Sequence, residues 1–416
     1  MTQATEPTDT LSTREAAAYL GIKPETLYAY VSRGLVKGLR GPRGRGRHYR
    51  RADLEPLRAR SAGPAAQALG YGEPVLETRI TRIGASGPAY RGHLATTLVE
   101  KGASFEAVAE LLWTGELPAE PVAWPDWPSE APPLRERDFA RLLPAGSPPL
   151  SVLALVLPAL AANDPLRYDA EPAAVRLRAR RLIARLAAAV SLSVHPKCLP
   201  AALEAPDVVS ALALSLGVPL RPRPLDLLRS ALILCADHEL NASTFAARVA
   251  ASTGADLHAC LSAALAALSG PRHGGASEQV ERLLHEAGSP ARAAIAVGER
   301  LRRGELLPGF GHPLYPQGDP RLPPLWARAQ ALKPRSARLR TLQAVVDAVQ
   351  GMGRPQANID VGLTATCAAL ELPPGMGPAI FAIGRLAGWV AHVLEQQQSS
   401  QLLRPRARYV GDEPVS

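Results

Sequence analysis

Four short segments in the second half of the chain carry residues suited to acid/base chemistry. His238 opens a run of polar side chains, and His273 and His312 each lie beside glycines that let a ligand approach the backbone closely. Arg321 follows His312 by nine residues, and Asp360 stands just before an apolar segment of helical pattern. Imidazoles and a carboxylate of this kind can move a proton and stabilise a developing oxyanion.

Arginines near the C-terminus would supply partners for an anionic substrate. Arg385 lies among small, closely packed residues, where a buried guanidinium requires an anion. Arg404 and Arg406 add groups suited to bidentate recognition of carboxylates. Together with the three histidines and the acid, they predict a site that binds a polycarboxylate and performs acid/base chemistry.

Each segment also has a purely structural interpretation when it is taken alone. The polar run 237–244 would be a hydrogen-bonded patch on a helix predicted over 232–253, although short polar residues are poor choices for a helix interior. His273 would be an exposed residue in a turn, and Asp360 would cap the helix that follows it. The residues alone leave these alternatives open.

Motifs for metal, nucleotide-phosphate and serine chemistry are missing from the sequence. His238 and Glu239 would begin a zinc-binding H-E-x-x-H motif, but Ala242 stands where the second histidine is required. No G-K-[ST] phosphate loop or G-x-S-x-G elbow occurs, and the four cysteines form no C-x-x-C pair. We therefore expect no metal site and no bound cofactor.

The elements that must position these residues are predicted to be mainly α-helical. One hairpin is predicted within 76–90, and the nine prolines of 118–149 exclude long helices there. Elsewhere, apolar residues at helical spacing predict helices over 173–190, 224–253, 257–268, 278–286, 291–303, 336–352, 361–370 and 376–395.

Composition indicates a globular protein of more than one domain. Of 416 residues, 47% are hydrophobic and 20% are charged, values that exclude wholesale disorder. The first residues lack the apolar stretch of a secretory signal, and the most apolar run, 150–162, is shorter than a membrane helix requires. We therefore expect no membrane span. Because the cysteines are scattered, we also expect a reducing, cytoplasmic location.

Residues 1–60 have the pattern of a small winged helix-turn-helix, followed by a linker over 61–75. Ser12 and Glu15 form a capping box at the start of one helix, and Pro24 suits the first turn of a second. A glycine- and arginine-rich stretch then reads as a wing. This unit resembles the MerR and excisionase type of helix-turn-helix.

The charge of this N-terminal unit indicates an anionic partner. It holds twelve basic and six acidic residues, and so carries +6 of the net charge of +9. The basic side chains lie at the end of the second helix and in the wing, where phosphate contacts would dominate binding to duplex DNA. The candidate contacts are Arg33, Lys37, Arg40, Arg43, Arg45 and Arg47.

The remainder of the chain, roughly residues 70–416, strongly resembles the citrate synthase family. The ordered segments that carry the resemblance are Asp237-His-Glu-Leu-Asn-Ala-Ser-Thr-Phe245, Gly270-Pro-Arg-His-Gly-Gly-Ala276, Gly309-Phe-Gly-His312 with Asp319-Pro-Arg321, Asn358-Ile-Asp360, and Arg404-Pro-Arg-Ala-Arg-Tyr-Val-Gly411. The resemblance implies an all-α homodimer with a large domain over 76–273 and 372–416 and a small domain over 274–371.

The resemblance also implies a role for each candidate residue. Asp360 would remove a proton from the methyl group of acetyl-CoA, His273 would bind the thioester oxygen, and His312 would polarise the ketone of oxaloacetate. The carboxylates of oxaloacetate would be held by His238, Arg321, Arg385 and, from the other subunit, Arg404. No metal or cofactor is implied, because acyl-CoA enters as a substrate.

Three functions are compatible with these residues. The first is a citrate synthase that uses acetyl-CoA, and the second is a 2-methylcitrate synthase that uses propionyl-CoA. The third is a DNA-binding regulator whose synthase-derived body senses oxaloacetate or acyl-CoA, although retention of the base Asp360 disfavours pure sensing. Ser277, where the family usually has asparagine, and Val361 to Thr364 depart from the family pattern and bear on the choice of acyl-CoA.

Overall fold

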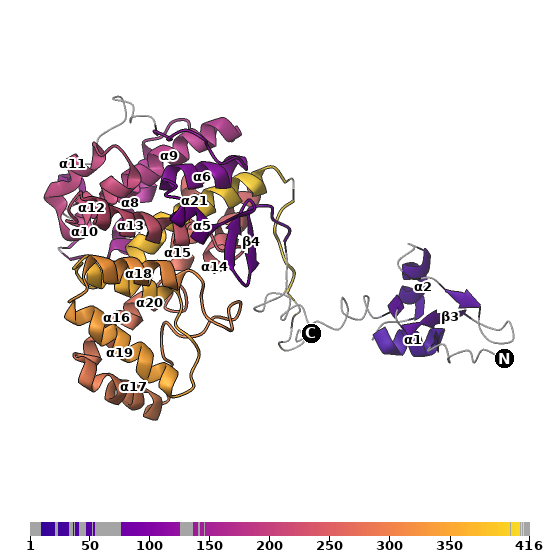
Figure 1. Cartoon of the computed structure of the whole chain (residues 1–416). Helices are drawn as coiled ribbons and strands as arrows, with labels where there is room; N and C mark the ends of the chain where they lie inside the picture. The colour runs from indigo at the N-terminus through magenta and orange to yellow at the C-terminus, as the bar shows by residue number, and fades with distance from the viewer. Residues whose placement is uncertain are drawn as a thin grey trace. The chain divides into compact units, whose positions relative to one another are not determined.

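The computed structural model describes residues 10–20, 24–32, 36, 38–40, 47–51, 53–54, 76–124, 136–139, 142–144, 146–399, 401–407, 409 and 411. The chain divides into two compact units, and Figure 1 shows the whole chain. One comprises Met1–Glu77 with Pro405–Ser416, and the other comprises Thr78–Arg404.

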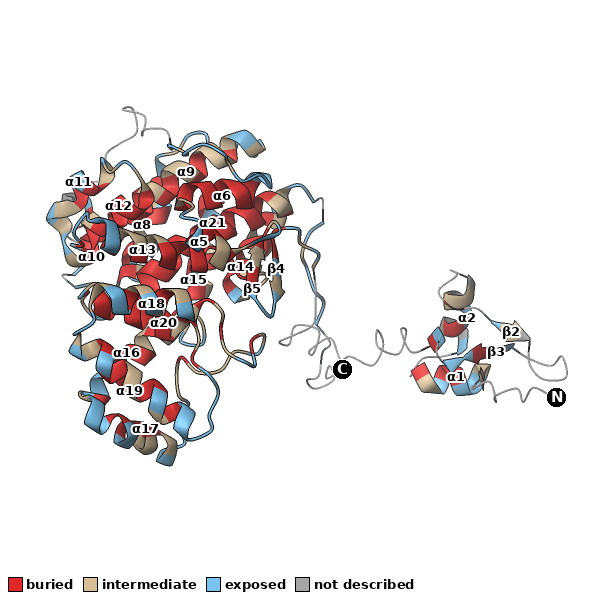
Figure 2. Ribbon diagram, viewed as in Figure 1, coloured by how far each residue is buried: buried red, intermediate tan, exposed pale blue. Residues whose placement is uncertain are grey.

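The N-terminal unit contains the predicted helix-turn-helix with a short sheet. Helix α1 (Thr13–Leu20) packs against helix α2 (Pro24–Ser32) and against strands β1 (Thr10–Ser12) and β3 (Arg47–Arg50). Together with β2 (Leu39–Arg40), these strands form an antiparallel sheet in the order β1-β3-β2. Its buried residues are Ala16, Ala17, Leu20, Leu27, Val36, Tyr49 and Leu54 (Figure 2).

The predicted capping box at the start of α1 is confirmed. The Ser12 backbone N–H donates to the Glu15 carboxylate at 2.9 Å, and the Glu15 N–H lies 3.4 Å from the Ser12 hydroxyl oxygen. Of the candidate DNA contacts, Arg47 is exposed on β3, and Arg40 lies on β2. The other four, Arg33, Lys37, Arg43 and Arg45, lie outside the described residues.

The second unit begins with the predicted hairpin. Strands β4 (Thr81–Gly84), β5 (Gly87–Tyr90) and β6 (His93–Leu94) form an antiparallel sheet in sequence order. The hydroxyl of Tyr90 donates to the carbonyl oxygen of Ile233 at 2.9 Å, and the backbone N–H of Arg79 donates to Glu395 at 2.8 Å. These bonds fix the hairpin against the helical body.

The remaining regular elements described in this unit are helical. The α-helices are α5 (Ala95–Glu100), α6 (Phe105–Thr114), α7 (Glu136–Phe139), α8 (Pro149–Ala162), α9 (Pro172–Ala189), α10 (Ser191–Val194), α11 (Leu199–Leu203), α12 (Val208–Ser215), α13 (Pro222–Cys235), α14 (Ala242–Ser252), α15 (Leu257–Leu268), α16 (Ala276–Ala287), α17 (Ala293–Arg302), α18 (Leu322–Leu332), α19 (Ala337–Gly351), α20 (Ile359–Ala369) and α21 (Gly377–Gln397). Within the described part of the proline-rich stretch, only the short α7 and the start of α8 are helical.

Helix α21 runs through the centre of this body and packs against α6, α9, α13, α14 and α15 (Figure 1, yellow). Among the described residues it is the one helix long and apolar enough to cross a membrane, yet its most apolar stretch is wholly buried inside the protein. Glycines allow its close packing, because a Cβ at Gly384 would lie 2.7 Å from the carbonyl oxygen of Leu232. The C-terminal part of α13 therefore meets the interior of α21 backbone to backbone.

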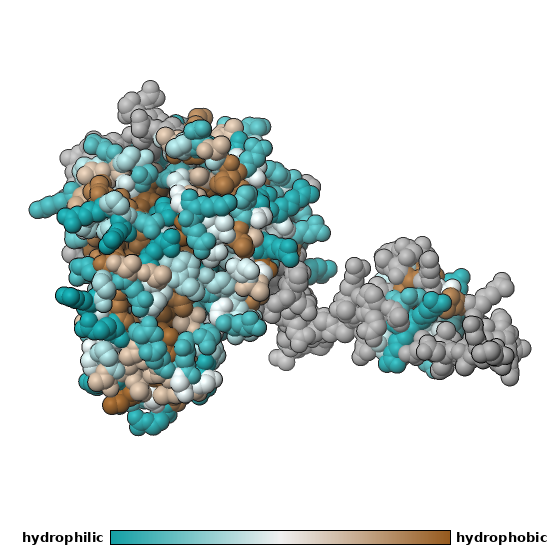
Figure 3. Space-filling model, viewed as in Figure 1, coloured by the Kyte–Doolittle hydropathy of each residue, from teal (hydrophilic) through white to brown (hydrophobic). Residues whose placement is uncertain are grey.

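A second, smaller core lies among α16, α17 and α19 (Figure 1, orange). Its buried residues are Leu283, Ala287, Ala293, Ala296, Val297, Val345 and Val349. The face of the second unit seen in Figure 3 intersperses hydrophilic and apolar side chains.

One predicted element is wrong. The continuous helix expected over 232–253 is interrupted, because α13 ends at Cys235 and α14 begins at Ala242. Asn241 is the N-cap of α14, where its side-chain oxygen accepts from the Thr244 N–H at 3.1 Å. Glu239 adopts φ +55°, in the left-handed region. The short polar residues that are unfavourable inside a helix here form a turn and a cap instead.

Candidate active site

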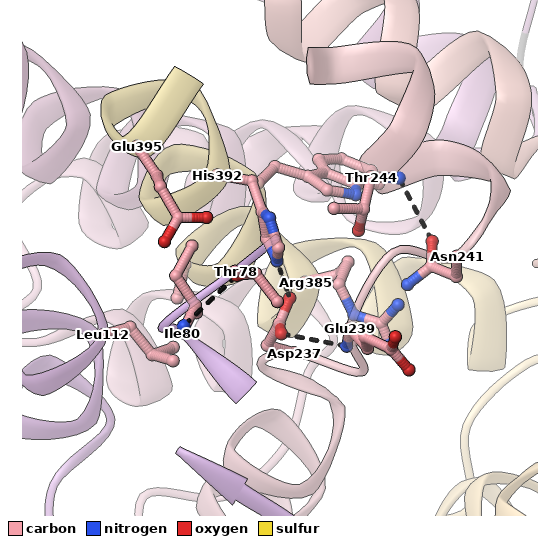
Figure 4. A network of polar contacts seen from close by, with 12 residues as sticks. Thr78, Ile80, Leu112, Asp237, Glu239, Asn241, Thr244, Arg385, His392 and Glu395 are labelled. Atoms are coloured by element: carbon pink, nitrogen blue, oxygen red, sulfur yellow. Dashed lines mark hydrogen bonds and ion pairs between the residues drawn. The ribbon is translucent and has the colours of Figure 1, made fainter. Parts of the chain in front are cut away.

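The turn between α13 and α14 carries the first candidate residues into the interior. Asp237 is fully buried, and His238 is 8% exposed. One Asp237 carboxylate oxygen accepts from the Glu239 N–H at 3.1 Å (Figure 4). Burial alone would raise the pKa of Asp237, but His392 and Arg385 outweigh burial and hold that pKa below its usual value. Asp237 is therefore an internal anion directly before His238.

His238, His312 and Tyr315 form an aromatic cluster. The Nε2 atom of His238 lies 2.9 Å from the Tyr315 hydroxyl, and the rings of His238 and His312 are 5.2 Å apart. Burial and the charges of Arg321 and Arg385 hold the pKa of His238 well below 6.5. Both Arg321 and burial also lower the pKa of His312. The two imidazoles are thus neutral at pH 7.

The tautomer of His312 follows from its surroundings. Its Nδ1 atom accepts from the backbone N–H of Leu314 at 3.2 Å. A neutral imidazole that accepts on one nitrogen carries its proton on the other. His312 therefore presents an Nε2–H donor, which is the form required to polarise a carbonyl oxygen.

Arg321 is held by an adjacent acid. Its guanidinium donates to both carboxylate oxygens of Asp319, at 2.9 and 2.7 Å, and both side chains are almost completely buried. The Ile359 N–H also donates to Asp319, at 3.1 Å. Burial lowers the pKa of Arg321, but Asp319 outweighs burial and raises it, so that the guanidinium stays charged. Asp319 thus fixes a permanent cation beside the start of α20.

Arg385 is a nearly isolated cation in the core. It is 1% exposed, its Nε–H donates to the carbonyl oxygen of Cys235 at 2.6 Å, and its guanidinium stacks 4.5 Å from the Phe381 ring centroid. Burial lowers its pKa, although the nearby Asp237 opposes this. Among the described residues no carboxylate forms a salt bridge with Arg385. A guanidinium in this situation favours an anionic ligand.

His273 lies between α15 and α16 and faces the N-terminus of α14. Its Nε2 atom lies 2.8 Å from the Ser243 hydroxyl, which also accepts from the Trp389 indole N–H at 3.1 Å. Burial, followed by the charge of Arg385, lowers the pKa of His273 to about 4. His273 is therefore a neutral, oriented imidazole and not an exposed residue of a turn.

Asp360 stands in the first turn of α20. The cap of this helix is Asn358, whose side-chain oxygen accepts from the Asp360 N–H at 2.9 Å. Among the described residues, the Asp360 carboxylate has no hydrogen-bond donor. Burial raises its pKa to about 7, with Asp319 adding to the rise and Arg321 opposing it. A carboxyl group with this pKa can act as a general base near neutral pH.

These side chains converge, with one exception. The charge of Arg321 acts to lower the pKa values of both Asp360 and His312. The charge of Arg385 lowers the pKa of His273. Arg404 instead is exposed in the segment 401–407, and within this single chain it contacts none of the other candidates. The neighbouring Leu403 N–H donates to Ser252 at 3.1 Å.

A cleft of about 760 Å³ opens beside the cluster. The hairpin residues Thr81 to Ala85 line one side, the loop 314–318 lines the other, and Glu239 reaches it from the turn. Tyr315 lines the cleft and contacts His238, so the cleft leads to the histidine cluster. No group of His, Cys, Asp and Glu suited to a metal ion is found in the described part of the chain.

The candidate residues had partners that the predicted site omitted. The hydroxyl of Tyr315 orients His238, and the carboxylate of Asp319 orients Arg321. The hydroxyl of Ser243 orients His273. Each lies within a few residues of a candidate in the sequence, or belongs to the polar run 237–244. Closeness in sequence to a candidate residue was therefore the only clue to these partners. The local sequence does not distinguish a side chain that orients a candidate from an ordinary loop residue.

Comparison with known proteins identifies relatives of both parts of the chain. Residues 70–406 match the family described as "Citrate synthase, C-terminal domain", and residues 10–60 match "Helix-turn-helix domain". The chain is 34% identical to 2-methylcitrate synthase of Mycobacterium tuberculosis, over 78% of this chain and 84% of that protein. It is 39% identical to citrate synthase 2 of Bacillus subtilis, over 46% of this chain but only 52% of that protein.

Among solved structures, the chain resembles citrate synthase from Thermotoga maritima with a TM-score of 0.68. The sequences are 29% identical, and the match covers 84% of this chain and 97% of the other. The mainly helical architecture that the sequence predicts is thereby confirmed.

Proposed function

Because the chain belongs to the citrate synthase family, we propose that it is an acyltransferase that condenses acetyl-CoA with oxaloacetate to give citrate and CoA. The observation that carries this proposal is the environment of Asp360. A carboxyl group with a pKa of about 7, coupled to the permanent cation Arg321 to which His312 is also coupled, suits the removal of a proton from carbon.

The first step would generate a nucleophile from the acyl-CoA. Asp360 takes a proton from the methyl group, and His273 stabilises the oxygen of the resulting enol. Nε2 of His273 is held 2.8 Å from the Ser243 hydroxyl, so Nδ1 is the ring nitrogen left for the thioester oxygen. Desolvation makes the carboxylate a stronger base than it would be in water.

The second step would join this nucleophile to oxaloacetate. His312 donates its Nε2–H to the ketone oxygen, and the new carbon–carbon bond forms as that oxygen gains its proton. The carboxylates of oxaloacetate bind His238, Arg321 and Arg385, of which the two arginines are fully buried cations. Water then cleaves the thioester and releases CoA.

A dimer would complete the site. We propose that Arg404 binds the substrate of the partner subunit, since in its own chain it is exposed and apart from the other candidates. We also retain the proposed division into a large domain, 76–273 with 372–416, and a small domain, 274–371, that closes on the substrates. Closure would bring Asp360 onto the acyl group only after oxaloacetate has bound.

A thiol-release assay with oxaloacetate and a panel of acetyl-, propionyl- and butyryl-CoA tests the reaction and its acyl donor. We expect CoA release from acetyl-CoA only when oxaloacetate is present. Faster release from propionyl-CoA would instead assign the 2-methylcitrate reaction, which the relative from Mycobacterium tuberculosis supports by its name. A protein that binds oxaloacetate but releases no CoA would be a sensor, not an enzyme.

A second function, binding of duplex DNA, is favoured by the N-terminal unit. The described arginines Arg47, Arg50 and Arg51 are exposed on and directly after β3, next to a helix-turn-helix. We expect a steep salt dependence and modest sequence preference, because these arginines lie in the wing, where phosphate contacts dominate, and not on the second helix.

A salt titration of duplex binding by the full chain checks this prediction. Replacing both Arg47 and Arg50 by alanine should weaken binding at low salt and flatten the salt dependence by about two counterions. Arg302→Ala, which removes an exposed arginine from the other unit, is the matched control. Equal binding by all three proteins would contradict a DNA contact through β3.

A further inference from the structure

A row of polar side chains crosses the buried face of α21, beyond the residues used in the proposed reaction. It starts at Arg385 and continues through His392 to Glu395 and Gln396, at spacings that place side chains on one side of a helix. His392 is fully buried, as is Asp237, which it faces (Figure 4). A buried histidine paired with a buried carboxylate calls for a functional explanation, because well-packed apolar residues would stabilise a core at least as well.

The bonding of His392 fixes its tautomer. Its Nδ1 atom lies 3.4 Å from a guanidinium nitrogen of Arg248, and arginine can only donate. Nδ1 therefore accepts, and a ring proton lies on Nε2. Nε2 is 3.4 Å from a carboxylate oxygen of Asp237, an ion-pair distance longer than a formed hydrogen bond, and among the described residues neither of these two atoms has any hydrogen-bond partner.

Apart from His392, Asp237 is enclosed by backbone and by the side chains of Thr81 and Arg385. Its second oxygen accepts from the N–H of Glu239, the residue with a left-handed backbone. Gly388 of α21 packs directly on the carboxylate, because a Cβ there would lie only 2.3 Å from the oxygen that faces His392. The carboxylate thus connects α21 to the turn that presents His238.

The outer end of this row of polar side chains contacts the base of the hairpin that lines the cleft. Arg248 donates to Glu395 at 2.8 Å and to Gln396 at 3.0 Å. The second oxygen of Glu395 accepts from the backbone N–H of Arg79, at the foot of the hairpin that lines the cleft. One continuous set of contacts therefore holds both the hairpin and the turn at 237–239.

We propose that His392 is a positioning residue for oxaloacetate binding. Its Nε2–H orients the Asp237 carboxylate, and Asp237 in turn holds the left-handed turn at Glu239, which places the His238 side chain beside Tyr315. The inference rests on the proposed function, since it takes His238 to be a ligand of oxaloacetate. His392 itself touches neither substrate in this scheme.

Three substitutions separate positioning from simple filling of space. The terminal amide of glutamine is as far from the backbone as Nε2, so His392→Gln keeps a donor toward Asp237. The amide of asparagine is as far as Nδ1, so His392→Asn keeps only the contact with Arg248, and His392→Leu keeps neither. His258→Gln is the control, because His258 is equally buried and faces Asp256 at 3.4 Å, away from the site.

Calorimetric titration of the full-length proteins with oxaloacetate alone, together with thermal unfolding, gives the required readouts. We expect His392→Asn and His392→Leu to weaken oxaloacetate binding by about 10- to 100-fold, the range for a lost hydrogen bond to a charged group. His392→Gln should stay within about threefold of the wild type by the same reasoning. The KM for acyl-CoA should be unchanged throughout, and His258→Gln should bind oxaloacetate normally.

Each outcome decides the matter. If the wild type does not bind oxaloacetate, the proposed function fails and the inference falls with it. If the wild type binds and all three His392 variants bind equally well, the positioning role alone is wrong. If Gln, Asn and Leu weaken binding alike, or if all three abolish the thermal transition, His392 serves the fold and not the site.

Discussion

Replacing Asp360 by asparagine should abolish turnover and, at the same time, stabilise the folded protein. The turnover loss follows from removing the proposed base. The gain in stability follows because the native protein holds this carboxyl group in a desolvated position, where ionisation is unfavourable. Asparagine has nearly the same shape and cannot ionise, so it escapes this cost.

The size of the gain depends on pH. The pKa of Asp360 is about 7 in the folded protein, against 3.8 for a free aspartate. Between these values the native state binds more protons than the unfolded chain, so stability falls as pH rises through that window. The cost is absent below pH 3.8 and complete above pH 7, where it reaches about 4 kcal/mol at about 1.36 kcal/mol per pH unit. Between pH 5.5 and pH 8 it grows by about 2 kcal/mol.

Denaturant unfolding of the wild type and Asp360→Asn at pH 5.5 and pH 8 measures this difference. The variant should be more stable at both pH values, and its advantage should be about 2 kcal/mol larger at pH 8. Asp347→Asn, which changes an exposed aspartate of α19, should show no such dependence. In the wild type, kcat/KM should fall about tenfold per pH unit below pH 7, since only the ionised base is active.

Two results would refute this reasoning. A stability gain that is the same at pH 5.5 and pH 8 would mean that the folded protein does not raise the pKa of Asp360. Activity that stays constant down to pH 5.5 would mean that the ionised group with a pKa near 7 is not the base.

Two further predictions concern the substrate carboxylates. Arg385→Ala should weaken oxaloacetate binding by about 10- to 100-fold, whereas Asp360→Asn should leave it nearly intact, because the aspartate acts on the acyl-CoA. Calorimetric titration with oxaloacetate compares the two variants. An equal loss of affinity would contradict the assigned roles. Mixing inactive Arg404→Ala and Asp360→Asn subunits should restore about a quarter of wild-type activity, since half of randomly formed dimers hold one site free of both lesions. No recovery after verified subunit exchange would argue against an arginine shared across the interface.

Apolar spacing predicts part of the helical body well, although α5, α6, α8, α12 and α18 lie outside the predicted ranges. The helix predicted over 257–268 has those bounds in the structure, and those predicted over 173–190 and 336–352 agree within one residue at each end. The capping box of Ser12 and Glu15 also forms as expected. These features depend on residues that are neighbours in the sequence, which is why the sequence alone can specify them.

The interruption of the helix at 236–241 could not be predicted in the same way. Its left-handed residue is a glutamate, and the carboxylate that holds it belongs to Asp237, whose partner His392 lies about 150 residues further along the chain. The short polar residues of this run already disfavour a helix interior, but the contact with His392 gives no local signal of where the helix stops. The misplaced element is accordingly the one that presents His238.

Asp360 shows how a structural and a functional interpretation can be separated. The sequence allowed this aspartate to be a helix cap, a role that would satisfy its carboxylate and lower its pKa. In the structure, Asn358 caps α20 two residues earlier, and the Asp360 carboxylate is left without a donor in the described protein while burial raises its pKa. A helix that already has a cap gains nothing from a second, desolvated acid in its first turn. A group kept at such a cost to stability is expected where its basicity is used, and the fixed cation Arg321 lies close enough to favour the ionised, basic form of the carboxylate.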